Sequence, residues 1–99
     1  MALEMNPTPH TMKSIMITVT ADHISRGVKK DCGSCPVALA ISDGVGGGGA
    51  WVSNSRLEYH APDGRLIKAR TPRSVQRFVV SFDQWLTVKP FRFRLNPTQ

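Results

Sequence analysis

The chain has 99 residues, of which 40% are hydrophobic and 20% are charged, and its formal net charge is +6. This length and composition predict one soluble globular domain and exclude an intrinsically disordered chain. A membrane-spanning chain is also excluded, because no apolar run approaches the ~20 residues that cross a bilayer.

The charge is distributed unevenly along the chain. Residues 1–50 carry four basic and four acidic side chains, whereas residues 51–99 carry nine basic and three acidic ones. This asymmetry indicates an anionic partner for the second half, either nucleic acid or an acidic protein surface. The alternative is a solvated face that only keeps the protein soluble.

Residues 1–12 predict a flexible lead-in, because they contain Pro7 and Pro9 with polar residues around them, and residues 13–96 predict the single globular domain. Residues 1–11 have no basic start followed by an apolar stretch, so we expect no secretory signal and a cytoplasmic location.

Residues 13–19 predict a half-buried strand, because the side chains divide between two faces: Ile15, Ile17 and Val19 on the buried one and Ser14, Met16 and Thr18 on the other. Thr20 then predicts the cap of a short helix that runs through Arg26, and Gly27 is expected to end it.

A second short helix is expected to begin near Cys35 or Pro36, since proline is tolerated in the first turn, and to run to about Ser42. Residues 43–49 contain five glycines and predict a mobile loop.

Residues 51–53 begin a predicted strand, and residues 56–61 and 65–69 predict a hairpin around the turn at residues 62–64. Within this hairpin, Leu57 and Tyr59 are expected on the buried face.

The clearest predicted helix starts after Thr71 and Pro72. Its apolar side chains recur at spacings of three and four residues and are expected to form one buried face: Val75, Phe78, Val79, Phe82 and Leu86. Residues 89–95 predict a final strand. The order of elements predicts an α+β fold, a single small domain in which one long helix and two short helices cover a mainly antiparallel sheet of four to five strands.

Cys32 and Cys35 stand where a helix is predicted to start, and this spacing has three explanations. A redox pair would benefit from the helix dipole and from two nearby lysines, although thioredoxin-like proteins place such a pair directly after a core strand. A zinc site would need Cys32, Cys35, His23 and His60 together, with His10 left in the lead-in. The structural explanation, in which both thiols remain reduced and Cys35 is buried, is preferred.

Other enzymatic chemistry is not expected. No serine lies in a nucleophile-elbow context, and the seven carboxylates are scattered. A dyad of Cys35 with His23 or His60 would form only if the fold brought those residues together. The glycine run lacks the Lys-Ser/Thr ending of a phosphate loop, so no cofactor is expected.

The basic side chains of the second half are the predicted partner-binding residues. They are Arg65, Lys68, Arg70, Arg73, Arg77, Arg92 and Arg94. Arg73 and Arg77 lie near the start of the last helix, where the dipole disfavours positive charge and where the two repel each other. A ligand phosphate or an acidic protein patch would supply the missing negative charge.

Three segments resemble small uncharacterised proteins encoded by bacteriophages and prophages. The matching residues are Ile17-Thr18-Val19-Thr20-x-x-His23-Ile24-x-x-Gly27, Cys35-Pro36-Val37-Ala38-Leu39-Ala40, and Phe82-Asp83 followed by Val88-x-Pro90-Phe91-x-Phe93. This resemblance implies a phage setting in the host cytoplasm and no established activity.

The leading hypothesis is a non-enzymatic binding protein that blocks a host protein or nucleoprotein complex through its basic surface, with an anti-defence or anti-CRISPR inhibitor as one form. The alternative is direct binding of nucleic acid, for which exposed aromatic residues among the basic ones are needed, and Trp51 and Trp85 are the candidates. A thiol-dependent or zinc-dependent protein is the third hypothesis.

Overall fold

The computed structural model describes residues 14–46 and 48–96; the predicted lead-in over residues 1–12 lies outside this range. Eight elements follow one another along the described chain. They are β2 (Ile15–Val19), α1 (Ala21–Arg26), α2 (Pro36–Val45), β3 (Ala50–Val52), β4 (Arg56–His60), β5 (Leu66–Arg70), α3 (Arg73–Asp83) and β6 (Phe91–Leu95). None of the described helices has the length and apolar character needed to span a bilayer.

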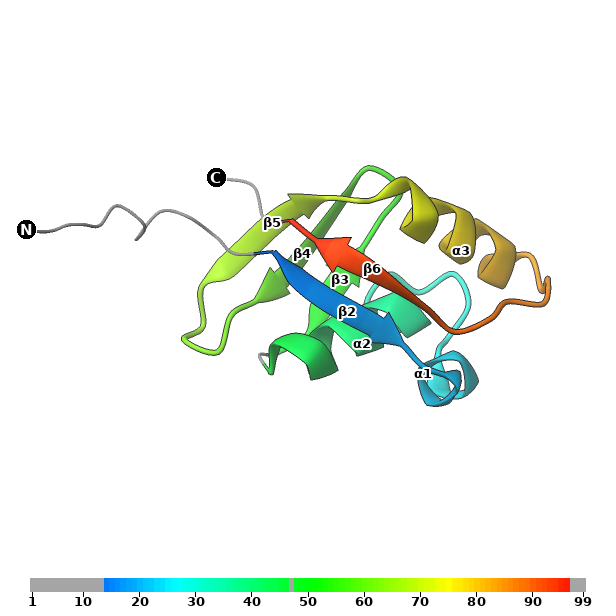
Figure 1. Ribbon diagram of the computed structural model, residues 1–99, viewed down its shortest axis with the longest axis horizontal. Coiled ribbons are helices and arrows are strands. Elements are labelled where there is room, and N and C mark those ends of the chain that lie inside the picture. Colours follow the sequence, from blue (N-terminus) through cyan, green and yellow to red (C-terminus); the bar gives the residue numbers. More distant parts are fainter. Residues whose placement is uncertain (1–13, 47, 97–99) are drawn as a thin grey trace, which may run out of the picture.

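The α+β fold with antiparallel strands is confirmed, but the strands form two sheets instead of one (Figure 1). β2 pairs with β6, so that Ile15 lies opposite Leu95 and Val19 opposite Phe91. β3, β4 and β5 form a separate three-stranded meander. The expectation of one long helix is also wrong, because α2 has 10 residues and α3 has 11.

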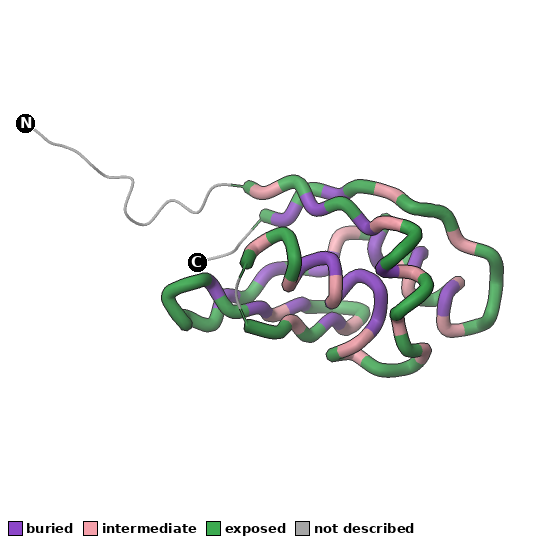
Figure 2. Tube along the Cα trace, turned by 90° about the horizontal axis from the view of Figure 1, so that it is seen from below, coloured by how far each residue is buried: buried purple, intermediate pink, exposed green. Residues whose placement is uncertain are grey.

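The core lies between the two sheets and is filled largely by α2, which packs against β2, β3 and β4. Val37 and Ile41 of α2 are fully buried, as are Ile17 of β2 and Leu57 of β4. Figure 2 shows the buried residues gathered along the interior of the molecule, with exposed residues at its ends. Small side chains on this helix allow both sheets to approach it closely.

The short helix α1 has the predicted caps, with Thr20 at its start and Gly27 at its end. Gly27 is needed for space rather than for an unusual backbone. Its φ is −67°, and a Cβ atom there would lie 2.5 Å from the ring of Pro36. The absence of a side chain lets the end of α1 lie directly against the start of α2.

The predicted loop over residues 43–49 begins too early, because α2 continues to Val45. Gly44 lies inside the helix, where a Cβ atom would be 2.9 Å from Cδ1 of Ile17. Close packing on β2 therefore outweighs the weak helix propensity of glycine. Gly46, with φ +75°, ends the helix in a left-handed conformation.

The apolar face of α3 is confirmed for its central residues. Val75, Phe78 and Phe82 are buried, and the rings of Phe78 and Phe91 stack with centroids 4.8 Å apart, which attaches α3 to β6. Leu86 is an exception and is 57% exposed, because the helix ends at Asp83 before reaching it.

Candidate anion-binding surface

Three of the predicted partner-binding arginines meet in one place, where β5 leads into α3. They line an open hollow of about 780 Å³, which we call the arginine hollow. Its lining consists of Ser55, Arg70, Thr71, Pro72, Arg73, Gln76, Arg94 and Asn96. Arginine, amide and hydroxyl groups are therefore all present, and no carboxylate lines the hollow.

The hollow has a fixed floor because the β3–β4 turn is tied to the start of α3. The Thr71 hydroxyl donates a hydrogen bond of 2.8 Å to the carbonyl of Ser53. The side-chain amide of Gln76 donates to the carbonyl of Asn54. These two bonds hold the β3–β4 turn beside Arg70 and Arg73.

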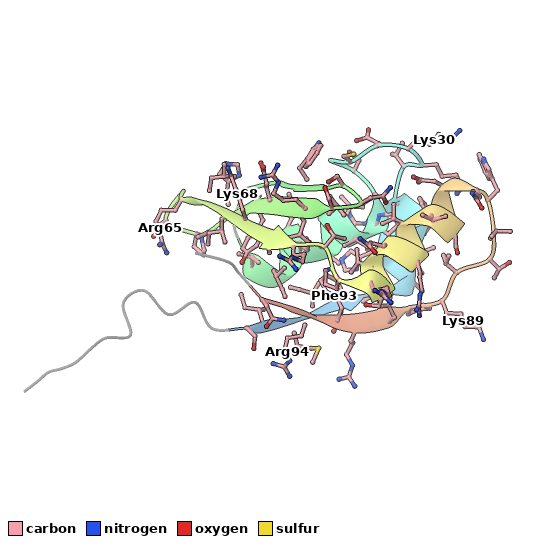
Figure 3. The ribbon with its side chains drawn as sticks, turned by 90° about the horizontal axis from the view of Figure 1, so that it is seen from above. Lys30, Arg65, Lys68, Lys89, Phe93 and Arg94 are labelled. Carbon is pink, nitrogen blue, oxygen red and sulfur yellow. The ribbon has the colours of Figure 1, made fainter. Side chains whose placement is uncertain are left out.

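Arg94 reaches the hollow from the other sheet. It lies on the exposed face of β6, opposite Met16 of β2, and its guanidinium donates a 2.9 Å hydrogen bond to the hydroxyl of Ser14 (Figure 3). The hollow therefore spans both sheets, and it depends on the pairing of β2 with β6.

The charges around the hollow repel one another. Arg56 and Arg70 lie directly opposite each other across β4 and β5, where like charges are unfavourable. Arg73 occupies the first position of α3, which has no side-chain cap and no acidic residue in its first turn. Among the described residues, no carboxylate forms an ion pair with Arg56, Arg70, Arg73 or Arg94. A bound anion would relieve this repulsion.

The other predicted partner-binding residues lie outside the hollow. Arg65 lies in the β4–β5 turn, at the far end of the hairpin in Figure 3, with Nε 2.8 Å from a carboxylate oxygen of Asp63. Hydrogen bonds from the backbone N–H and guanidinium of Arg65 hold the pKa of Asp63 below its ordinary value. Lys68 lies opposite Glu58, and Arg77 and Arg92 are exposed on α3 and β6.

Sequence reasoning missed Arg56, which lies opposite Arg70 but outside the lining of the hollow, and it missed the neutral side chains that line the hollow. Counting residues outward from the predicted turn at 62–64 would have placed Arg56 opposite Arg70, so that signal was present. Asn96 and Gln76 carried no comparable signal, because only the folded chain brings them to the hollow.

The thiols fit the structural explanation. Cys35 is buried and caps α2, with its Sγ accepting a hydrogen bond from the N–H of Ala38 at 3.4 Å. Burial raises the pKa of the Cys35 thiol, despite opposing hydrogen bonds from the backbone. A raised pKa disfavours the thiolate that redox chemistry requires. Both cysteines are free, and Cys32 is only half-buried.

The proposed zinc ligands are not brought together. Throughout the described residues, no three or more His, Cys, Asp or Glu side chains form a group that could hold a metal ion. His60 lies exposed on β4, whereas His23 is buried between α1 and α2. The Cys35–histidine dyad is likewise disfavoured, since His23 is engaged elsewhere.

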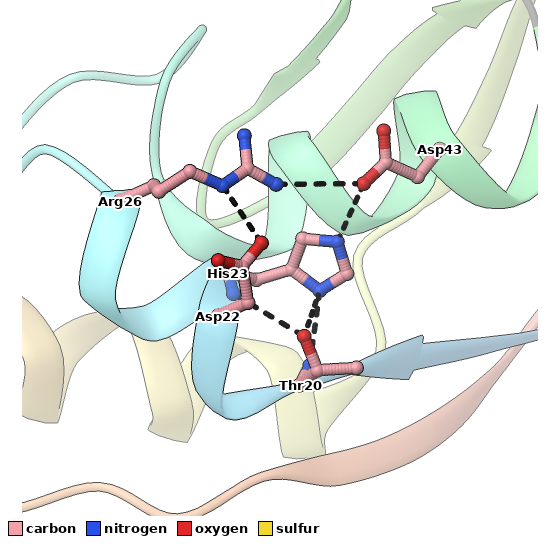
Figure 4. A network of polar contacts seen from close by, with 5 residues as sticks. All are labelled: Thr20, Asp22, His23, Arg26 and Asp43. Carbon is pink, nitrogen blue, oxygen red and sulfur yellow. Dashed lines mark hydrogen bonds and ion pairs between the residues drawn. The ribbon is translucent and has the colours of Figure 1, made fainter.

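His23 belongs to a polar network that joins α1 to α2 (Figure 4). Its Nε2 lies 2.7 Å from a carboxylate oxygen of Asp43, and its Nδ1 accepts a 3.0 Å hydrogen bond from the backbone N–H of Thr20. Nδ1 is therefore unprotonated, and Nε2 carries the proton that is donated to Asp43. Arg26 also contacts this carboxylate, at 3.6 Å.

The network resembles a Thr–His–Asp catalytic triad, because the Thr20 hydroxyl is 3.0 Å from Nδ1 of His23. However, that hydroxyl accepts the N–H of His23 as the cap of α1, and Nδ1 is occupied by the N–H of Thr20. The arrangement is a capping box that secures the helix. We assign it a structural role.

No protein-family model matches the chain, and no curated protein or solved structure matches it either. The resemblance to phage-encoded proteins therefore stays a prediction. The arginine hollow is open to solvent, and its guanidinium groups are suited to phosphate or carboxylate groups.

Proposed function

We propose that this chain is a non-enzymatic binding protein that docks its arginine hollow on an anionic surface of a host protein or nucleoprotein complex and blocks that surface. One observation carries the proposal: arginines from β5, α3 and β6 converge on a hollow that contains neutral donors and no carboxylate.

The physical basis is unsatisfied charge. Guanidinium groups bind carboxylates and phosphates with paired, charge-assisted hydrogen bonds, which are about twice as strong as neutral ones. Neighbouring arginines repel each other in the free protein, so an anion gains both direct contacts and relief of that repulsion. A phage setting, with an anti-defence inhibitor as one form, rests on the sequence resemblance alone.

The experiment compares two triple variants with the same loss of charge. The hollow variant, Arg70→Gln/Arg73→Gln/Arg94→Gln, removes the three positive charges that line the hollow. The control variant, Arg26→Gln/Arg65→Gln/Arg92→Gln, removes three positive charges elsewhere on the protein. Binding of sodium polyglutamate and of a fluorescent oligonucleotide is measured for both by anisotropy or calorimetry. We expect the hollow variant to lose roughly tenfold or more in affinity for at least one ligand, and the control variant to lose much less.

Equal losses in the two variants would show that net charge alone causes binding and would contradict the proposal. A second candidate, direct binding of nucleic acid, is favoured by the exposure of Trp85, which is 80% accessible. Preference for the oligonucleotide over polyglutamate would select it.

A further inference from the structure

Trp85 stands at a position that glycine normally occupies. The N–H of Leu86 donates to the carbonyl of Ser81 at 3.0 Å, and the N–H of Trp85 donates to the carbonyl of Phe82 at 3.1 Å. This pair of bonds is the Schellman ending of a helix, whose left-handed residue is usually glycine. Trp85 adopts that conformation with φ +65°. A bulky residue held in a strained backbone points to a functional role.

The side chain of Trp85 is presented to solvent, since 80% of it is exposed. The Nζ of Lys29 lies 4.2 Å from the centroid of the indole ring and 3.9 Å from that of the Phe82 ring. This cation contact orients the indole and places a positive charge over one face of the ring. The result is an aromatic platform attached to the end of α3, with a lysine covering one of its two faces.

The platform borders a second hollow, of about 590 Å³, whose other lining residues are Lys30, Asn54, Val79, Val80, Asp83 and Gln84. The one carboxylate among them, that of Asp83, accepts a 2.9 Å hydrogen bond from the backbone N–H of Lys30. This hollow neighbours the arginine hollow. Asn54 lines the second hollow, and the next residue, Ser55, lines the arginine hollow. The side-chain amide of Gln76, on α3, donates to the carbonyl of Asn54 and so joins the β3–β4 turn to the helix at this point. Since α3 has 11 residues, the two ends lie roughly 16 Å apart along the helix. We call the two hollows with Trp85 the α3 track.

We propose that the α3 track binds single-stranded nucleic acid, with a base stacked on Trp85 and phosphates in the arginine hollow. This inference rests on the proposed function of the hollow and names its ligand. Aromatic platforms beside a basic groove are the usual means of binding single strands, because every base has a flat face and every nucleotide a phosphate. The track has the length of about five nucleotides at a stacked spacing of ~3.4 Å.

A single strand fits better than a duplex or an acidic peptide. In a duplex the bases are stacked on one another and cannot reach an indole without being flipped out. An acidic peptide would satisfy the arginines, but it provides no flat group for Trp85. Acidic protein therefore becomes an alternative outcome of the experiment.

The test measures anisotropy of fluorescently labelled dT12 with the full chain in about 50 mM salt. Trp85→Gly is the informative variant, because glycine suits the left-handed backbone and removes only the platform. Trp51→Ala is the matched control, since Trp51 is an exposed tryptophan on β3 outside the track. Thermal melting of both variants confirms that they fold.

We expect Trp85→Gly to weaken dT12 binding roughly 5- to 100-fold and Trp51→Ala to change it less than about twofold. Replacing the three arginines of the hollow with glutamine should reduce the slope of log affinity against log salt by about 2, since each lost phosphate contact on a single strand contributes ~0.7.

Hollow-dependent binding of polyglutamate without binding of dT12 would overturn this inference and leave the proposed function standing. Binding of dT12 that is insensitive to Trp85→Gly, or equally sensitive to Trp51→Ala, would also overturn it. Absence of binding to both ligands would refute the inference and the proposed function together.

Discussion

Replacing Arg73 with glutamate should stabilise the free protein while weakening its binding to anions. Arg73 lies at the start of α3, which lacks a side-chain cap and an acidic residue in its first turn, and Arg77 lies one turn further along. Reversing the charge converts an unfavourable dipole interaction of ~0.3 to 1 kcal/mol into a favourable one of similar size. It also converts an i,i+4 repulsion of ~0.2 to 0.5 kcal/mol into an attraction.

After allowance for the exposure of these side chains, the free energy of unfolding is expected to increase by about 1 to 2 kcal/mol at low salt. For a domain of this size, that gain corresponds to a rise in melting temperature of roughly 4 to 15 °C. Calorimetry or circular dichroism in 20 mM and 1 M salt measures it. The rise should shrink at 1 M salt, where the screening length is only ~3 Å.

Arg65→Glu is the control and should lower the melting temperature, because Arg65 forms an ion pair with Asp63 at 2.8 Å. The substitution removes that pair and places a second negative charge beside Asp63. A lower melting temperature for Arg73→Glu at low salt would refute the reasoning, because it would mean that the Arg73 guanidinium already stabilises the free fold. Higher stability combined with lost binding is the expected signature of a residue kept for function.

Four further predictions concern the core and the contacts around it. Tyr59 is buried and its hydroxyl has no hydrogen-bond partner in the described structure, so Tyr59→Phe should leave the urea midpoint unchanged or raise stability by up to ~1 kcal/mol. Iodoacetamide at pH 8 should modify Cys32 well before Cys35. Burial raises the pKa of the Cys35 thiol in the folded state above its value in the unfolded chain. The stabilising contribution of the neutral thiol should therefore be complete below the unfolded pKa of ~8.5 and be lost as the pH rises through the folded-state pKa. Cys35→Ala should abolish this pH dependence of the free energy of unfolding. Gly27→Ala should cost ~1 to 3 kcal/mol in urea unfolding, because its Cβ would lie 2.5 Å from Pro36; an unchanged midpoint would show that α1 and α2 can separate freely.

Local patterns in the sequence were enough to find most of the elements. The alternation in β2 correctly placed Ile17 and Val19 inside and Thr18 outside, and the hairpin turn is where it was predicted, with Gly64 at φ +93°. These features depend on the residues of one segment and on the period of its side chains. They can therefore be read without knowledge of the rest of the chain.

The failures share a different cause, which is contact between distant segments. Gly44 is helical because it packs on Ile17, and this contact is invisible in the glycine-rich sequence. The end of α3 was missed because a tryptophan, rather than glycine, occupies the left-handed position at residue 85. Arg94 enters the arginine hollow only because β6 pairs with β2, a partnership that no local pattern specifies.

The pairing of β2 with β6 also determines when folding can be completed. Ile15 lies opposite Leu95, so the first and last described strands meet across almost the whole chain, whereas β3, β4 and β5 are joined by short turns. Contacts between distant segments carry the largest loop-closure cost and form late. During synthesis, the meander and α2 can assemble early, but β2 has no partner until β6 emerges. The arginine hollow, which takes Arg94 from β6, is therefore among the last parts of the molecule to form.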